Sequence, residues 1–293
     1  MKPMYVYIQV VLLAAMSVGY TEGQSDSKKN MDFSDAKRPN RTRTYSDIAR
    51  LNLSCAKGLP GAEALEVEKS LATLKEWARL ATRETDKILP RFRKNPREFH
   101  DSESYFRMLV LATFLSRNIG LKYNPELIAA PTIEELKSTA FYRNSENIFI
   151  HGLIKKKLGT CSSLPVLFVS VGRFMGYPLR LVNAKAHLFA RWQDKEERFN
   201  IEYNGKGLIC HADEHYMKWP FEISKDELET GFFLRSLTPD EELATFLEQR
   251  AMCLLEHKRT DEAMTAFLEA YSLFPNHPYL KGYINSLGKR SPR

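Results

Sequence analysis

The sequence predicts an α+β protein, and three observations lead to that fold class. Apolar residues recur at helical spacing in the first half of the chain, an almost wholly apolar segment follows Cys161, and segments with strand alternation come after it. A helical layer followed by a buried helix and a meander of strands is an α+β arrangement. The 293 residues, 43% hydrophobic and 27% charged, exclude collagen-like and wholly disordered chains and allow one main domain with a smaller one.

The first 23 residues have the pattern of a secretory signal peptide. Lys2 precedes an apolar run from Tyr5 to Val18, and small residues follow that run. The run is shorter than the roughly 20 apolar residues that cross a bilayer as a helix, so we expect cleavage rather than a membrane anchor. Residues 24–45 are polar, basic and without pattern, which predicts a disordered linker. The mature protein is therefore expected to be secreted or periplasmic, with no membrane attachment.

Residues 46–143 are predicted to form a helical region. Apolar residues recur every three or four positions over Glu63–Ile88, and Pro90 is expected to close that helix. A second apolar stripe predicts a helix over Ser102–Ile119, with Gly120 at its exit. The first half of the chain is therefore predicted to be helical.

Residues 144–236 are predicted to carry the core, beginning with a buried helix. The segment CSSLPVLFVSVGRFMGY is apolar almost all round, as expected of a helix inside a core rather than on its surface. Pro165 has no N–H to donate, so this helix should begin at Ser162 or Ser163. Gly176 marks its end.

Two strands are predicted after this helix, at residues 179–192 and 198–203. Both carry β-branched and aromatic residues with alternation. The charged turn Asp194–Glu197 joins them, which predicts an antiparallel hairpin.

Residues 237–293 have the pattern of a single tetratricopeptide repeat and a tail. Arg250 is the one position that departs from the repeat consensus, and the matching positions are Leu247, Ala251, Leu254, Ala263, Phe267, Ala270 and Pro275. One repeat cannot bury its apolar face alone. The helix pair should therefore dock on the main domain or on a partner protein.

Cys161 is the candidate nucleophile and His187 the candidate base. Cys161 lies where the buried helix begins, and unpaired N–H groups and the helix dipole favour a thiolate there and could bind an oxyanion. His187 lies on the following strand, and an imidazole beside a thiol promotes its ionisation. Each residue alone is common in a protein core, and their combination is what indicates nucleophilic catalysis.

A polar residue on the second strand should orient the imidazole of His187. The expected hairpin makes Glu202 the diagonal neighbour of His187 and lets Asn200 face Arg191. Glu202 is therefore the first choice to hold the imidazole tautomer, Asn200 the second and Asn204 the third.

A resemblance to a known family rests on the segment GTCSSLPVLFVSVGRFMGYPLRLVNAKAHLFARW followed by RFNIEYNGKG. It is similar to the core of the transglutaminase-like superfamily, relatives of papain-type cysteine proteases, in the bacterial branch with a Gly-x-Cys-x-Ser-Leu-Pro signature and a tetratricopeptide tail. The segment LNLSCAKGLPGAE resembles that branch's N-terminal helical region. The resemblance implies a papain-like α+β fold in which Cys161 is the nucleophile and His187 the base. The family usually has Asp as the third residue, where this chain has Glu202 with Asn200 nearby.

The chemistry that the resemblance implies is acyl transfer. A thiolate attacks an amide carbonyl to give a thioester, which water or an amine then resolves, and no cofactor is needed. We therefore expect an exported cysteine-dependent enzyme that acts on amide or peptide bonds of a protein or peptide substrate. Solvent exclusion decides between hydrolysis and transamidation, and the residues leave both open. The alternative is a non-catalytic scaffold that binds a protein partner, with the repeat tail as its binding element.

A metal site and nucleic-acid binding fit the sequence less well. The segment His211–His215 matches His-x-x-Glu-His, a zinc-peptidase pattern that must lie on one helix. Pro220 follows closely and no helical stripe flanks the segment, so no metal is expected. The net charge is +7, but acidic residues are interspersed and no recognition module accompanies the basic run Lys155–Lys157. No nucleic-acid partner is expected.

The sequence does not decide whether the four cysteines form disulfides or remain free thiols. In an oxidising compartment Cys55, Cys161, Cys210 and Cys253 allow three full disulfide pairings. Buried free thiols are the alternative for Cys55 and Cys253.

Overall fold

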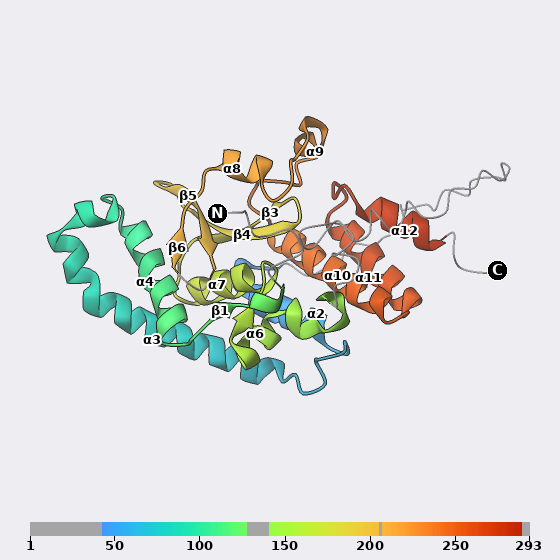
Figure 1. Cartoon of the computed structure of the whole chain (residues 1–293), viewed down its shortest axis with the longest axis horizontal. Helices are drawn as coiled ribbons and strands as arrows, with labels where there is room; N and C mark the ends of the chain where they lie inside the picture. Colours follow the sequence, from blue (N-terminus) through green and yellow to red (C-terminus); the bar gives the residue numbers. More distant parts are fainter. Residues whose placement is uncertain (1–42, 128–140, 205–206, 289–293) are drawn as a thin grey trace.

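The structure is a computed structural model that describes residues 43–127, 141–204 and 207–288. The predicted signal peptide and nearly all of the predicted linker lie outside these residues. Helices and two small sheets alternate along the chain, so the predicted α+β class is confirmed (Figure 1). The principal elements are α2 (Ile48–Ala56), α3 (Val67–Lys94), α4 (Glu103–Arg117), β1 (Lys122–Tyr123), α6 (Ile150–Lys156), β2 (Leu158–Gly159), α7 (Ser163–Phe174), β3 (Leu179–Ala184), β4 (His187–Gln193), β5 (Arg198–Tyr203), β6 (Leu208–Ile209), α8 (Asp213–Lys218), α9 (Lys225–Glu229), α10 (Pro239–Glu256), α11 (Thr260–Leu273) and α12 (Leu280–Gly288).

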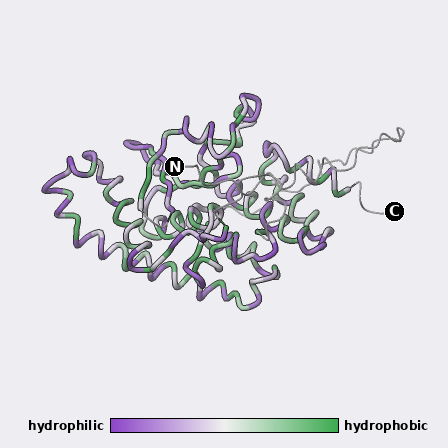
Figure 2. The backbone as a smooth tube through the Cα atoms, in the orientation of Figure 1, coloured by the Kyte–Doolittle hydropathy of each residue, from purple (hydrophilic) through white to green (hydrophobic). Residues whose placement is uncertain are grey.

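The long helix α3 and the shorter α4 form one end of the molecule (Figure 1). Along α3, hydrophilic and hydrophobic residues alternate, as expected of a helix with one buried side (Figure 2). The Ser102 hydroxyl accepts a hydrogen bond from the N–H of Tyr105 at the start of α4, and Gly120 follows the helix with a φ of +81°. The second predicted helix is therefore confirmed.

The prediction that Pro90 closes the first helix was wrong. Helix α3 continues to Lys94 with Pro90 inside it. The proline lies on an exposed position of the helix, where its missing hydrogen bond is tolerated. The extra turn carries Phe92 onto a small apolar cluster with Leu89, Phe99 and Phe106, and this packing favours the continued helix.

The buried helix is α7, which begins at Ser163 as predicted, and Gly176 follows it with a φ of +83°. Its residues from Ser163 to Gly172 are all buried. One side packs on the antiparallel sheet β3–β4–β5–β6, and the others pack against α2, α3 and α6. Helix α7 is thus the centre of the main core, and both of its ends are fixed by neighbouring elements.

The segment 179–192 is two strands rather than one. It folds back at Lys185 and Ala186, so β3 and β4 form a hairpin of their own, in which Ala184 faces His187. Ala186 adopts a φ of +61°, a conformation that favours glycine, and the segment has no glycine to signal the turn. The predicted hairpin of β4 with β5 is confirmed, and the predicted pairing of Arg191 with Asn200 is observed.

The C-terminal helices dock on the main core. Helices α10 and α11 pack along each other, with Ala251, Ala263 and Ala270 fully buried between them. Helix α10 also packs on α2, and the guanidinium of Arg250 donates to the carbonyls of Cys55 and Lys57 at the end of α2 over 2.7 and 2.6 Å. Arg250 therefore helps to fasten the α10–α11 pair to the core.

A buried ion pair also joins the C-terminal helices to the core. Arg173 of α7 donates from both terminal nitrogens to Glu242 of α10 over 3.0 and 2.5 Å, and both side chains are almost fully buried. Within the three described ranges, no helix combines the length and apolarity that crossing a membrane requires.

Candidate active site

Cys161 lies between a short parallel sheet and the start of α7. Strand β2 pairs with β1, and a Cβ atom at Gly159 would come within 2.7 Å of Leu164 and 2.9 Å of Leu153. Only glycine fits there, so β2 runs directly against α7 and delivers Cys161 two residues before the helix. The Cys161 N–H donates to the hydroxyl of Tyr123 over 3.0 Å. The thiol is largely buried, with 5% of the residue exposed.

His187 is the first residue of β4, directly after the turn at Ala186. Its Nε2 lies 2.9 Å from Oε2 of Glu202, and Tyr216 donates its hydroxyl to the same oxygen over 3.1 Å. An ionised carboxylate only accepts, so Nε2 carries a proton, and in the neutral form of the ring Nδ1 is the nitrogen that accepts. Glu202 thus holds the ring in the tautomer that leaves Nδ1 free to take a proton.

The imidazole also interacts with the Cys161 thiol. Cys161 contributes to raising the pKa of the ring, and Nδ1 of His187 is buried without a hydrogen-bond partner among the described residues. Catalytic hydrogen bonds are often long before substrate binds. The structure therefore brings Cys161, His187 and Glu202 together in one cluster.

The pKa of His187 is set by opposing effects. Burial alone would lower it, but the negative charge of Glu202 and the side-chain contacts with Cys161 and Glu202 outweigh burial and raise the pKa to about 10. The site therefore favours an imidazolium whenever an anion lies beside it.

Two aromatic side chains of the segment around α8 enclose the imidazole. The ring of Tyr216 lies parallel to that of His187 with centroids 6.2 Å apart, and Trp219 meets it edge-on at 4.9 Å. Tyr216 also stacks on Phe189 at 3.9 Å. Tyr216 and Trp219 were not predicted as site residues from the sequence. The one signal available was that these two aromatic residues lie three positions apart, after a charged segment.

Asn200 belongs to a different network. Its carbonyl accepts from Nε of Arg191 over 2.7 Å, and its amide donates to Asp213 over 2.7 Å and to the carbonyl of His211 over 2.9 Å. The partner of His187 is thus Glu202, and Asn200 does not contact the imidazole. Asn204 lies one residue beyond the end of β5. The buried guanidinium of Arg191 also donates to Asp213 over 2.8 Å and so fixes the start of α8.

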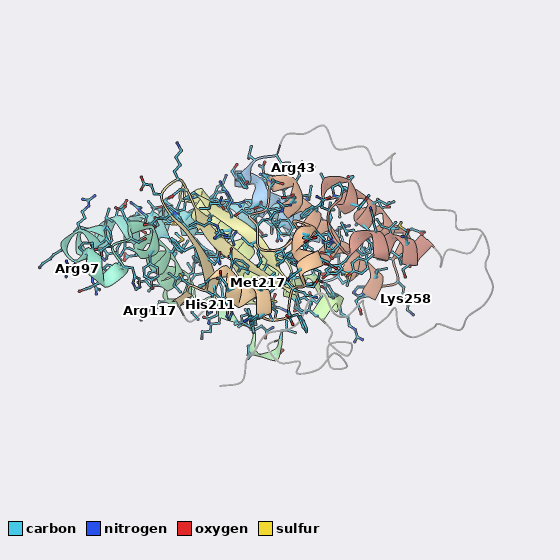
Figure 3. All side chains as sticks on the ribbon, turned by 90° about the horizontal axis from the view of Figure 1, so that it is seen from above. Arg43, Arg97, Arg117, His211, Met217 and Lys258 are labelled. Carbon is cyan, nitrogen blue, oxygen red and sulfur yellow. The ribbon has the colours of Figure 1, made fainter. Side chains whose placement is uncertain are left out.

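The His-x-x-Glu-His segment does not meet the helical condition of a zinc-peptidase motif. Helix α8 begins at Asp213, so His211 precedes it and only Glu214 and His215 lie within its six residues. The two imidazoles stack on each other at 3.9 Å beside the sheet, where Figure 3 labels His211 and Met217 near the middle of the molecule. In the part of the chain that the structure describes, no group of three or more His, Cys, Asp or Glu could hold a metal ion.

The cysteines other than Cys161 and the basic run Lys155–Lys157 have surroundings that indicate structural rather than catalytic roles. All four cysteines are free. Burial raises the pKa of Cys55 and of Cys253 to about 12, so both thiols stay protonated at neutral pH. Lys155 and Lys156 form ion pairs with Glu146 over 2.8 and 2.5 Å.

Comparison with known proteins finds sequence similarity over the same part of the chain. A family model described as the transglutaminase-like superfamily matches residues 135–226, a range that includes Cys161, His187 and Glu202. A UPF0162 protein of Buchnera aphidicola subsp. Schizaphis graminum is 24% identical over 145 residues, covering 48% of this chain and 53% of the relative. A second UPF0162 protein, from B. aphidicola subsp. Acyrthosiphon pisum, is 23% identical with the same coverage. The chain thus spans about half the length of these relatives, and no solved structure matches it.

Proposed function

We propose that this protein is an exported cysteine-dependent acyl-transfer enzyme that acts on amide or peptide bonds through a thioester. The observation that carries the proposal is the cluster of Cys161, His187 and Glu202, in which Nε2 of the imidazole is bound to the carboxylate and the thiol is near enough to the ring to influence its pKa. A nucleophile, a base and a group that orients the base are the parts that such catalysis requires. The transglutaminase-like match over residues 135–226 supports the same chemistry.

The geometry suggests how a catalytic cycle would run. His187 takes the thiol proton at Nδ1, and the sulfur attacks the carbonyl carbon of an amide. The imidazolium then gives its proton to the departing amine, which leaves an acyl thioester on Cys161. Water or an amine next attacks the acyl carbon of the thioester and gives a proton to His187. The C–S bond breaks, so that the acyl group is released as an acid or a new amide, and the Cys161 thiolate regains its proton from the imidazolium.

The N–H of Cys161 is the candidate donor for the oxyanion of this reaction. It donates to the hydroxyl oxygen of Tyr123, which marks a position where an oxygen can accept from it. A substrate carbonyl would take the place of that hydroxyl. The residues at this site call for no cofactor in the proposed cycle.

Four further parts of the proposal come from the sequence. Residues 1–23 support export as a signal peptide, and the substrate is proposed to be a protein or peptide. The α10–α11 pair is proposed to be a tetratricopeptide repeat, supported by its consensus residues and by the alanines buried between the helices. The main domain is proposed to have a papain-like core.

Selective alkylation tests the proposal. In a Cys210→Ser background, which removes the exposed thiol, iodoacetamide at pH 6.5 should modify Cys161 and spare Cys55 and Cys253, whose pKa values are raised to about 12. His187→Gln should slow the modification of Cys161 by about tenfold or more, because the proton acceptor is lost. Peptide mass spectrometry measures both.

The matched control is Asn200→Ala, which leaves the imidazole and its carboxylate in place. Cys161→Ala should retain the fold and lose amidase, peptidase and transamidase activity measured with a panel of peptide amides. Two results would favour the non-catalytic scaffold instead. One is that Cys161 is alkylated no faster than Cys253, and the other is that enzymatic activity persists in the Cys161→Ala variant.

A further inference from the structure

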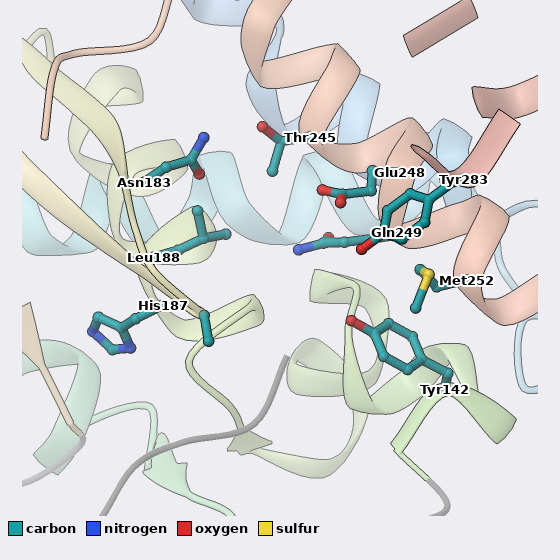
Figure 4. Close-up of a pocket in the computed structure, with 10 residues that line it drawn as sticks. Tyr142, Asn183, His187, Leu188, Thr245, Glu248, Gln249, Met252 and Tyr283 are labelled. Atoms are coloured by element: carbon teal, nitrogen blue, oxygen red, sulfur yellow. The ribbon is translucent and has the colours of Figure 1, made fainter. Parts of the chain in front are cut away.

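A small cavity of about 20 Å³ lies between the β3–β4 hairpin and the C-terminal helices. Asn183, Ala186 and His187 line it from the hairpin, and Glu248 and Gln249 line it from α10 (Figure 4). The imidazole of His187 points away from it, so the cavity lies behind the proposed catalytic cluster. A cavity needs about 10–15 Å³ to hold one water molecule, so this one has room for a single water and for little more.

Two buried polar atoms on the wall of this cavity lack a partner. Nδ2 of Asn183, a donor, and Oε1 of Gln249, an acceptor, make no hydrogen bond with any described residue, although the two residues are only 2% and 4% exposed. Buried polar groups in folded proteins are nearly always paired. Two such atoms on one cavity therefore indicate a small group that both accepts and donates hydrogen bonds.

Glu248 offers a third polar atom at the same place. Its side chain and that of Gln249 both extend from α10 toward the hairpin (Figure 4). Glu248 contacts His277 through Oε2, over 3.2 Å, which leaves Oε1 for a further donor. One donor and two acceptors are what a single water satisfies, since buried waters typically make about three hydrogen bonds. A cation could bind the two acceptors, but it would leave Nδ2 of Asn183 unpaired.

The cavity adjoins the part of the hairpin that carries His187. Asn183 of β3 pairs with Leu188 of β4, and the next pair of the register is Ala184 with His187. Ala186 and His187 themselves line the cavity. A bridge between Asn183 and α10 would therefore restrain the end of the hairpin to which the imidazole is attached.

We propose that this cavity binds one water molecule, which accepts from Nδ2 of Asn183 and donates to Oε1 of Gln249 and Oε1 of Glu248. Gln249 is thereby a positioning residue for His187, acting through the water and the hairpin. The positioning role rests on the proposed function, whereas the water site does not. The C-terminal helices thus help to place the base of the main domain without touching the substrate.

Crystallography of the full-length protein, at a resolution that shows ordered waters, tests the water site. A density peak within about 3.2 Å of both amides is expected in the parent protein. The peak should be absent from the double variant Asn183→Leu with Gln249→Met, whose side chains are apolar at both positions. A direct hydrogen bond between the two amides, or a parent cavity without a peak, would overturn the assignment.

The positioning role is tested on the imidazole itself. In Gln249→Met the pKa of His187 should fall from about 10, because a displaced ring loses part of its attraction to Glu202. Alkylation of Cys161 at pH 6.5, in the Cys210→Ser background, should slow by about threefold or more, because proton transfer depends on alignment. Asn183→Leu should act in the same direction. The double variant should be little worse than the more affected single one, since both lose the same bridge.

Arg250→Met is the matched control, because Arg250 lies on the same helix but binds the carbonyls of Cys55 and Lys57. It should lower the urea midpoint of unfolding and leave the pKa of His187 and the alkylation rate unchanged. Parent-like values in Gln249→Met, or an equal change in Arg250→Met, would contradict the positioning role. Neither the density nor the pKa requires turnover, so a protein without enzymatic activity would refute the proposed function and leave the water site standing.

Discussion

At His187, burial and charge act in opposite directions on one proton. The ring is 4% exposed, which disfavours its charged form, yet Glu202 and Cys161 together raise its pKa to about 10. The hydroxyl of Tyr216 shares the same carboxylate oxygen, so the carboxylate is fixed from two sides. The protonation state of the imidazole therefore depends above all on the negative charge of Glu202.

Glu202→Gln removes that charge while preserving the size of the side chain. Burial then acts with little opposition, so the pKa of His187 should fall from about 10 to below the 6.5 of a free imidazole. NMR titration of the imidazole carbons measures this value. Asn200→Ala is the control and should leave the pKa of His187 unchanged, because Asn200 bonds to Arg191. An equal shift in both variants would show that Glu202 does not set the charge of the ring.

The same pair links stability to pH. The folded-state pKa of His187 is raised, so its stabilising contribution is complete below about pH 6.5 and is lost as the pH rises towards 10. The free energy of unfolding should therefore fall over that interval, by a few kcal/mol at most. Urea unfolding at a series of pH values should show this fall in the parent and a flatter dependence in His187→Gln. Parallel curves for the two proteins would contradict the assignment.

At the scale of the element, the β3–β4 turn fixes where the imidazole lies. Ala186 adopts a left-handed conformation and is 1% exposed, directly before His187. Lys185, at the tip of the turn, is tied to Glu227 of α9 over 2.8 Å. A tight turn thus determines the position of a proposed catalytic group.

Ala186→Gly and Ala186→Val should separate conformation from packing at this turn. Glycine adopts the left-handed conformation freely, so the free energy of unfolding should change by less than about 1 kcal/mol. Valine is β-branched and should cost about 1–3 kcal/mol there, and it should slow alkylation of Cys161 by displacing His187. Urea unfolding and alkylation rates measure the two effects. Equal alkylation rates in the two variants would mean that the turn does not position the imidazole.

Much of this element-level structure follows from local patterns in the sequence. The nearly all-apolar segment and Pro165 predicted the start of α7, and the alternation around the charged turn predicted that Arg191 would face Asn200. Strand periodicity then sufficed to bring Glu202 near His187.

What local patterns missed depends on contacts distant in the chain. The turn at Ala186 has no glycine or Asn-Gly signal, because the fold on either side of it imposes the left-handed conformation. Helix α3 continues through Pro90 because Phe92 packs on residues of α4. Tyr216 and Trp219 lie beside the imidazole, and the start of α8 next to them is bound by Arg191, which lies on a strand earlier in the chain.

At the scale of the whole molecule, the C-terminal helices and the main domain share one core. The pair of Arg173 and Glu242 crosses their boundary, and burial outweighs the attraction of Arg173 enough to raise the pKa of Glu242. A buried pair of this kind contributes little net stability, but the loss of one partner is costly. The contact therefore specifies how the two parts fit together.

Glu242→Ala should lower the free energy of unfolding by about 3–5 kcal/mol, because it leaves the guanidinium of Arg173 buried without a counter-charge. The double replacement of Arg173 by Met and Glu242 by Leu should cost much less. Glu262→Ala breaks the exposed pair with Arg259 and should change stability by less than about 1 kcal/mol. Urea unfolding followed by tryptophan fluorescence compares the three. Similar losses for Glu242→Ala and Glu262→Ala would mean that the boundary pair is not buried in solution.

The guanidinium of Arg250 has a consequence for how such chains diverge. It binds the carbonyls of Cys55 and Lys57 at the end of α2, nearly 200 positions earlier in the chain. Descendants that keep this arginine should also keep the end of α2 at Ala56 for it to cap, and those that lose one should lose the other. Grafting the C-terminal helices onto a distant homologue would then succeed only when the recipient brings a matching α2.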